Sequence, residues 1–100
     1  MDIRIQAIHF DITEKLHAFI EKKVGRITKS LPTAQTAEVV LKLVKPETAM
    51  NKEVQMRIDV PGAAKLHAEK TCDTFEEAID LCVDIIRRQA EKYKEKQQEK

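Results

Sequence analysis

Hydrophobic residues recur along the chain with two different periods, and the period predicts which segments are strands and which are helices. Ile3, Ile5 and Ala7 alternate with polar residues, which predicts a short half-buried strand over residues 2–8. From Leu16 onward the spacing changes to three and four, which is typical of an amphipathic helix. The apolar stripe of this helix consists of Leu16, Phe19, Ile20, Val24, Ile27 and Leu31.

Local signals mark both ends of this first helix. The segment Asp11-Ile-Thr-Glu14 has the pattern of a capping box, with Asp11 or Thr13 as the N-cap. Pro32 ends the helix, because the residue before a proline avoids the helical conformation. We therefore expect the helix to begin close to Thr13 and to end at Leu31.

Three further segments with strand patterns follow the first helix. Residues 36–45 are rich in valine and leucine, and residues 52–60 alternate between apolar and polar side chains. Residues 65–71 place Leu66 and Ala68 on one side. Each strand has one apolar and one polar face, so the sheet they form is expected to meet water on one side only.

The last third of the chain has the pattern of a second, longer helix that starts near Asp73 or Thr74. Either residue can pair with a glutamate three positions later, as N-caps do. The apolar stripe consists of Phe75, Ala78, Ile79, Cys82, Ile85, Ile86 and Tyr93. No apolar residue follows Tyr93, so we expect residues 97–100 to form a frayed tail.

The element order β-α-β-β-β-α predicts an α+β fold. We expect a four-stranded mixed sheet with both helices on one face, in which the first two strands are parallel and joined by a right-handed helical crossover. A chain of 100 residues fits one domain, which we place at residues 1–96.

Composition excludes several functional classes. The chain has two glycines, no phosphate-binding glycine loop, no nucleophile elbow and no HExxH motif, and its three histidines lie far apart in sequence. We therefore expect no enzymatic activity, no small-molecule substrate, no metal and no cofactor. Two cysteines do not make a disulfide framework, and no apolar run approaches the length of a membrane span. These features favour a cytoplasmic protein.

Charge is distributed unevenly, although the net charge of the whole chain is only +1. Residues 12–31 carry five bases and two acids, and residues 87–100 carry six bases and three acids. Residues 32–86 carry six bases and ten acids. Both positive segments fall on predicted helices. Their candidate binding residues are Lys22, Lys23, Arg26 and Lys29 on the first helix, and Arg87, Arg88, Lys92, Lys94 and Lys96 on the second.

Two interpretations of these cations are open. Lysine and arginine side chains bind phosphates, and arginine can contact two oxygens at once, so the clusters fit RNA or another polyanion. Cations near a helix C-terminus also complement the helix dipole, and Glu91, Glu95 and Glu99 can form simple ion pairs with them. The binding interpretation requires the two clusters to lie on the same side of the folded molecule.

The sequence resembles a known family, the bacterial ribosome hibernation promoting factors, also called ribosome-associated inhibitors or sigma-54 modulation proteins. The resemblance covers residues 3–96. It is carried by four motifs in order, which are Asp11-Ile-Thr-Glu-Lys-Leu16, Glu38-Val-Val-Leu-Lys42, Leu66-His-Ala68, and Asp73-x-x-x-x-Ala-Ile-Asp80 continuing to Arg88-Gln-x-x-Lys-x-Lys-x-Lys96. Because the chain ends at Lys100, it resembles the short members, which lack a C-terminal dimerisation domain.

The resemblance implies a fold similar to a double-stranded-RNA-binding domain. It also implies a factor that binds the small ribosomal subunit and its rRNA, occupies the mRNA and tRNA channel, and inhibits translation in starved or stationary-phase cells. The rRNA-binding positions that it carries over are Lys23, Arg26, Arg88, Lys92, Lys94 and Lys96. We expect a protein that is monomeric away from the ribosome and does not bind membranes.

The older family name leaves a second function open, a protein–protein modulator of transcription. Such a modulator would need an exposed contact surface, and the acidic side of the second helix offers one. The residues of that side are Glu76, Glu77, Asp80 and Asp84.

Overall fold

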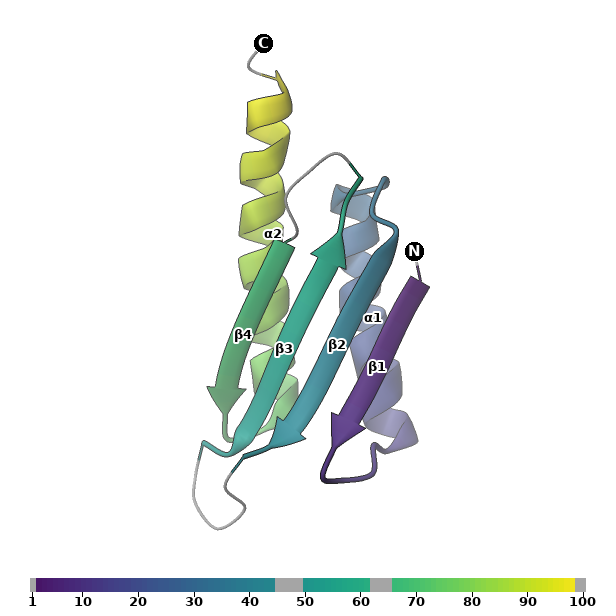
Figure 1. The fold of residues 1–100 in the computed structure, drawn as a ribbon, viewed down its shortest axis with the longest axis vertical. Coiled ribbons are helices and arrows are strands. Elements are labelled where there is room, and N and C mark those ends of the chain that lie inside the picture. Colours follow the sequence, from purple (N-terminus) through teal and green to yellow (C-terminus); the bar gives the residue numbers. More distant parts are fainter. Residues whose placement is uncertain (1, 45–49, 62–65, 99–100) are drawn as a thin grey trace.

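A computed structural model describes residues 2–44, 50–61 and 66–98 of the chain, and it shows one sheet with two helices behind it (Figure 1). The predicted order β-α-β-β-β-α is confirmed. The elements are β1 (Asp2–Ile8), α1 (Glu14–Ser30), β2 (Thr36–Leu43), β3 (Lys52–Asp59), β4 (Leu66–Cys72) and α2 (Phe75–Gln98).

The sheet is mixed, with strand order β1-β2-β3-β4. β1 and β2 are parallel, as predicted, and the other two pairs are antiparallel. One continuous row of register partners crosses all four strands, from Arg4 through Glu38 and Arg57 to His67. These pairings make β1 and β4 parallel to each other. Because α1 follows β1 and α2 follows β4, the two helices run in the same direction, and both lie on one face of the sheet (Figure 1).

Thr13 is the N-cap of α1. Its Oγ1 accepts a hydrogen bond from the Leu16 backbone N–H at 3.1 Å, which decides between the two caps that the sequence allowed. At the other end, the Leu31 N–H donates to the Ile27 carbonyl at 2.8 Å, and Leu31 is buried. The helix therefore ends where Pro32 predicts.

The start of α2 divides two roles between Asp73 and Thr74. Thr74 Oγ1 accepts from the Glu77 N–H at 3.1 Å, so Thr74 caps the helix. Asp73 Oδ1 accepts instead from the Met50 N–H at 2.7 Å, which ties the segment before β3 to the start of α2. The backbone of α2 is helical through Gln98, while residues 99–100 and the side chains of residues 94–98 lie outside the description. The frayed tail and the domain limit at residue 96 therefore stay predictions.

The core fills the space between the sheet and the two helices. Val39 and Leu41 from β2, Met56 from β3, Ile20 from α1 and Ile79 from α2 are all fully buried. The residues that alternate with the core positions along the strands form the open face of the sheet, which no helix covers (Figure 1). Neither helix has the length and apolar content to cross a membrane, over the residues described.

Both cysteines belong to this core. Cys82 is fully buried on α2, as its place in the apolar stripe predicts, and its Sγ donates to the Val54 carbonyl at 3.6 Å. Burial raises the pKa of the Cys82 thiol to about 12. Cys72, at the end of β4, is also buried, and this burial raises the pKa of its thiol. Both thiols are therefore protonated and weakly nucleophilic at neutral pH.

Candidate nucleic-acid interface

One cation of α1 lies on the side of the helix that turns toward α2. Lys23 identifies this side, because its Nζ lies 3.1 Å from Asp80 Oδ1 on α2. Arg26 follows Lys23 by three residues and is exposed, so it lies on the adjoining flank. On the opposite flank, across the buried stripe, His17 pairs with Glu21 at 2.7 Å. Lys22 and Lys29 are also exposed, and helical spacing places them further round α1, on its solvent side.

Arg87 is the α2 cation on the side that faces α1. It follows Asp80 by seven residues, which is two helical turns, and Lys29 follows Lys23 by six. Because α1 and α2 run in the same direction (Figure 1), these steps bring Arg87 and Lys29 to roughly the same height along the two helices. We call Lys23, Arg26 and Arg87 the inter-helix cations, and Lys22 and Lys29 lie beside them on the solvent side of α1.

Lys92 lies on a different flank of α2, and we call Arg88 and Lys92 the outer cations. Lys92 follows Gln89 by three residues, and Gln89 binds the backbone of β4, the edge strand on the far side from α1. Arg88 is exposed and lies between the two flanks, four residues after Asp84. The two predicted clusters thus share one end of the molecule, and among the α2 cations whose side chains the structure describes, only Arg87 lies on the flank that faces α1.

Two of the candidate cations are in ion pairs. Lys23 pairs with Asp80, and it also lies 5.4 Å from the centre of the Phe19 ring. Arg88 Nη2 lies 3.0 Å from Asp84 Oδ2, one helical turn away. Among the side chains that the structure describes, Lys22, Arg26, Lys29, Arg87 and Lys92 are in no ion pair. The side chains of Lys94 and Lys96 lie outside the described part.

The pairs with Asp80 and Asp84 bear on the binding interpretation. The Arg88–Asp84 pair is exposed and the Lys23–Asp80 pair is partly exposed, and surface pairs are worth about 0–1 kcal/mol. A phosphate can therefore compete for the same cations at small cost. The Asp84–Arg88 spacing of four residues was visible in the sequence, whereas the Lys23–Asp80 pair joins two helices and required the fold.

The same two pairs limit the acidic surface on α2. Glu76 and Glu77 are exposed, while Asp80 and Asp84 each hold a cation. Leu81 lies between these two aspartates in sequence and is 40% exposed. The acidic side that the transcription hypothesis requires is therefore partly neutralised.

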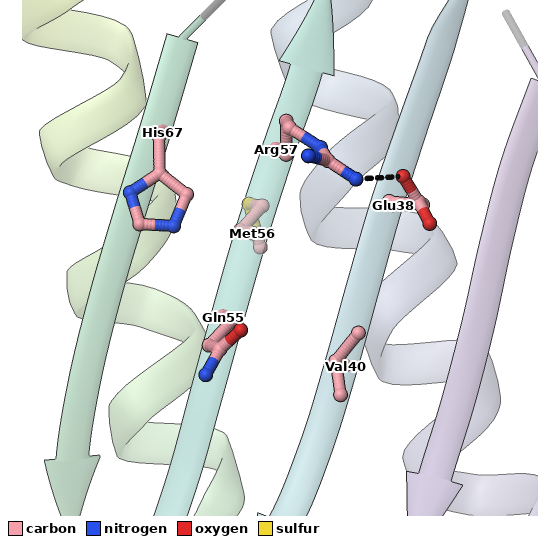
Figure 2. Close-up of a pocket in the computed structure, with 6 residues that line it drawn as sticks. All are labelled: Glu38, Val40, Gln55, Met56, Arg57 and His67. Carbon is pink, nitrogen blue, oxygen red and sulfur yellow. Dashed lines mark hydrogen bonds and ion pairs between the residues drawn. The ribbon is translucent and has the colours of Figure 1, made fainter.

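The open face of the sheet carries a separate small hollow (Figure 2). Its volume is about 110 Å³, and Arg57 and Glu38 close one side of it through an ion pair of 2.7 Å. His67 from β4 and Gln55 from β3 lie beside this pair, as Figure 2 shows. The hydrogen bond to Glu38 raises the pKa of the Arg57 guanidinium. The basic groups of this hollow are balanced by the neighbouring acid, so it is not a second polyanion surface.

Among the described residues, no group of three or more His, Cys, Asp or Glu side chains could hold a metal ion. His9, His17 and His67 are all exposed. His67 and His17 lie on opposite layers of the molecule, one on β4 and the other on α1.

The chain is similar in sequence to named proteins and in fold to a solved structure. A ribosome hibernation promoting factor of Pseudomonas putida is 26% identical over 98 residues, which cover 98% of this chain and 91% of that protein. One from Azotobacter vinelandii is 27% identical over 100 residues, which cover 100% and 89%. A ribosomal subunit interface protein from Coxiella burnetii has the same fold, with a TM-score of 0.79 and 21% identity over 94% of this chain and 98% of that one.

The family-level match covers almost the whole chain. It runs over residues 3–98, from β1 to the end of α2, and so includes both cation clusters and the four motifs found in the sequence. The chain belongs to the family described as Sigma 54 modulation protein / S30EA ribosomal protein.

Proposed function

We propose that this protein is a non-enzymatic ribosome-binding factor that occupies the mRNA and tRNA channel of the small subunit and so inhibits translation during starvation. The observation that carries the proposal is that Arg26 and Lys29 on α1 and Arg87 on α2 are exposed cations on two helices that pack against each other and run in the same direction (Figure 1). Family membership supports it, because the two relatives described above are named ribosome hibernation promoting factors.

The proposed mechanism is steric. Cations that are fixed on two packed helices bind rRNA phosphates, which orients the protein without any reading of base sequence. A-form RNA is recognised mainly by its shape and its backbone. A protein held in this way excludes mRNA and tRNA from the space that it fills, and no chemical step is required. The proposal places the protein in the cytoplasm, as a monomer away from the ribosome.

Binding to small ribosomal subunits should depend steeply on salt. If about five phosphates are neutralised, the logarithm of the affinity should fall with the logarithm of salt concentration with a slope of roughly −4. Co-sedimentation of the purified protein with small subunits through sucrose gradients, over a series of salt concentrations, measures this slope. Binding that does not change with salt would contradict the proposed phosphate contacts.

Removing the partner of Lys23 should strengthen binding. In an Asp80→Asn variant, Lys23 loses its carboxylate partner and becomes available to a phosphate, so we expect about threefold to tenfold tighter binding at low salt. Glu21→Gln is the matched control, because it makes the same change in charge on the opposite flank of α1. Equal gains from the two variants would show that net charge alone acts, and would contradict a role for Lys23.

The transcription hypothesis makes a different prediction about partners. Affinity capture from a lysate treated with nuclease distinguishes the two functions. Loss of all partners except ribosomal components would favour ribosome binding, whereas a non-ribosomal protein that survives RNA digestion would favour a transcription modulator. The neutralisation of Asp80 and Asp84 supports the first outcome.

A further inference from the structure

Gln89 makes an unusual contact between α2 and the edge of the sheet. Its Nε2 donates to the His67 carbonyl at 2.8 Å, and its Oε1 accepts from the His67 backbone N–H at 3.0 Å. One side-chain amide thus satisfies both backbone groups of one residue. A neighbouring β-strand would make the same pair of bonds.

The position of His67 explains why these backbone groups are available. His67 is paired with Arg57 on β3, and β4 is the last strand of the sheet. In an antiparallel pair, the backbone groups of alternate residues point toward the partner strand or away from it. Those of His67 point away, toward the free edge, where unpaired groups invite another strand. Gln89 closes this part of the edge from within the chain.

Apolar packing alone holds the second half of α2 weakly. Up to Ile86 the helix buries large residues, among them Ile79 and Ile86. Between Ile86 and Tyr93 the buried apolar residue is Ala90, and Tyr93 packs against the core while half-buried. One methyl group and one partly buried ring resist rotation of the helix about its axis less than the large buried residues of the first half do. Two hydrogen bonds from one planar amide to one peptide backbone fix that rotation much better than one bond would.

We propose that Gln89 is a positioning residue that sets the rotation of the second half of α2, and thereby directs Arg87 toward α1, Lys92 toward the outer flank and Arg88 between them. The three cations lie within three residues of Gln89 on the same helix. The effect on ribosome binding rests on the proposed function, whereas the effect on α2 does not.

The first arm of the test uses the isolated protein and the variant Gln89→Met, which has a side chain of similar length without the amide. Amide hydrogen exchange should accelerate at least tenfold at His67, because Gln89 accepts its N–H in the wild type. Residual dipolar couplings of residues 87–93 should change, while those of β2 and β3 stay constant. Gln6→Met, an exposed glutamine on β1, is the matched control.

A second variant separates the two hydrogen bonds between Gln89 and the backbone of His67. In Gln89→Glu the carboxylate can still accept from the His67 N–H but cannot donate to its carbonyl. We expect the His67 amide to stay protected and the dipolar couplings of residues 87–93 to shift. Unchanged exchange at His67 in Gln89→Met, or unchanged couplings in both variants, would overturn the inference whatever happens on the ribosome.

The second arm measures small-subunit binding of Gln89→Met over a series of salt concentrations. The charge of the protein is unchanged, yet the salt slope should become shallower by about one, the contribution of roughly one phosphate contact. Simple destabilisation lowers the folded fraction without altering this slope. An unchanged slope with altered dipolar couplings would overturn the link to binding. Failure of the wild type to bind would instead reject the proposed function, and the first arm would still decide the role of Gln89.

Discussion

Reversing the charge of Arg26 and Arg87 together should reduce the affinity for small ribosomal subunits on the order of 100-fold. Each arginine is exposed, and each is proposed to contact a phosphate through charge-assisted hydrogen bonds worth about 1.5 kcal/mol or more. Losing both contacts removes about 3 kcal/mol, which corresponds to two orders of magnitude in the dissociation constant. Co-sedimentation of the Arg26→Glu/Arg87→Glu variant with small subunits measures the loss.

The matched control reverses two arginines on the open face of the sheet. Arg4→Glu/Arg57→Glu makes the same change in net charge, but on the layer opposite to the helices. We expect a loss of less than about fivefold, due to long-range repulsion alone. A third variant, Arg88→Glu/Lys92→Glu, tests the outer cations and should also abolish co-sedimentation. If the charges of Arg26 and Arg87, or of Arg88 and Lys92, are reversed and co-sedimentation is undiminished, that pair of cations has no role in binding.

Replacing Leu41 by alanine should destabilise the fold by about 2–5 kcal/mol. Leu41 lies on β2, one of the two central strands, and is fully buried between the sheet and the helices. The loss combines the transfer free energy of the removed methyl groups with the cost of the cavity that remains. Urea unfolding monitored by circular dichroism measures the difference as a lower midpoint with an unchanged slope.

Leu81 provides a control with the same chemical change. It lies on α2 and is 40% exposed, so Leu81→Ala leaves little cavity and retains a good helix former. We expect a change of less than about 1 kcal/mol. Similar losses from Leu41→Ala and Leu81→Ala would show that the core does not lie between the sheet and the helices as described.

The periodicity of apolar residues was sufficient to predict the order of the six elements. Alternation is set by the geometry of a strand, and spacing of three and four by that of a helix, so both are properties of local sequence. The ends of elements were predicted less sharply. β2 ends at Leu43 rather than at residue 45, and β4 extends to Cys72 rather than ending at residue 71; residues 45 and 65 themselves lie outside the described residues.

The choice between competing caps needed the tertiary structure. Asp73 and Thr74 are equally good N-caps by sequence, and Thr74 takes that position while Asp73 binds Met50 from 23 residues away. Such a contact depends on how the chain returns to the same place, which no local pattern records. Ala90 is the opposite case: it lies four residues after Ile86 and three before Tyr93, so the helical period places it in the buried stripe, although the predicted stripe left it out.

By itself, the sequence determined which residues are cationic, which helices carry them, and to which family the motifs point. The fold decided which of these cations are neighbours, since Lys23 meets Asp80 and Arg87 adjoins α1 only after two helices pack side by side. It also placed the Gln89 amide against the backbone of His67, a contact that the position of Gln89 in the sequence motif does not reveal. The physical reason is that side-chain type and helical period are local properties, whereas electrostatic pairing depends on distances of a few ångströms between segments far apart in the chain.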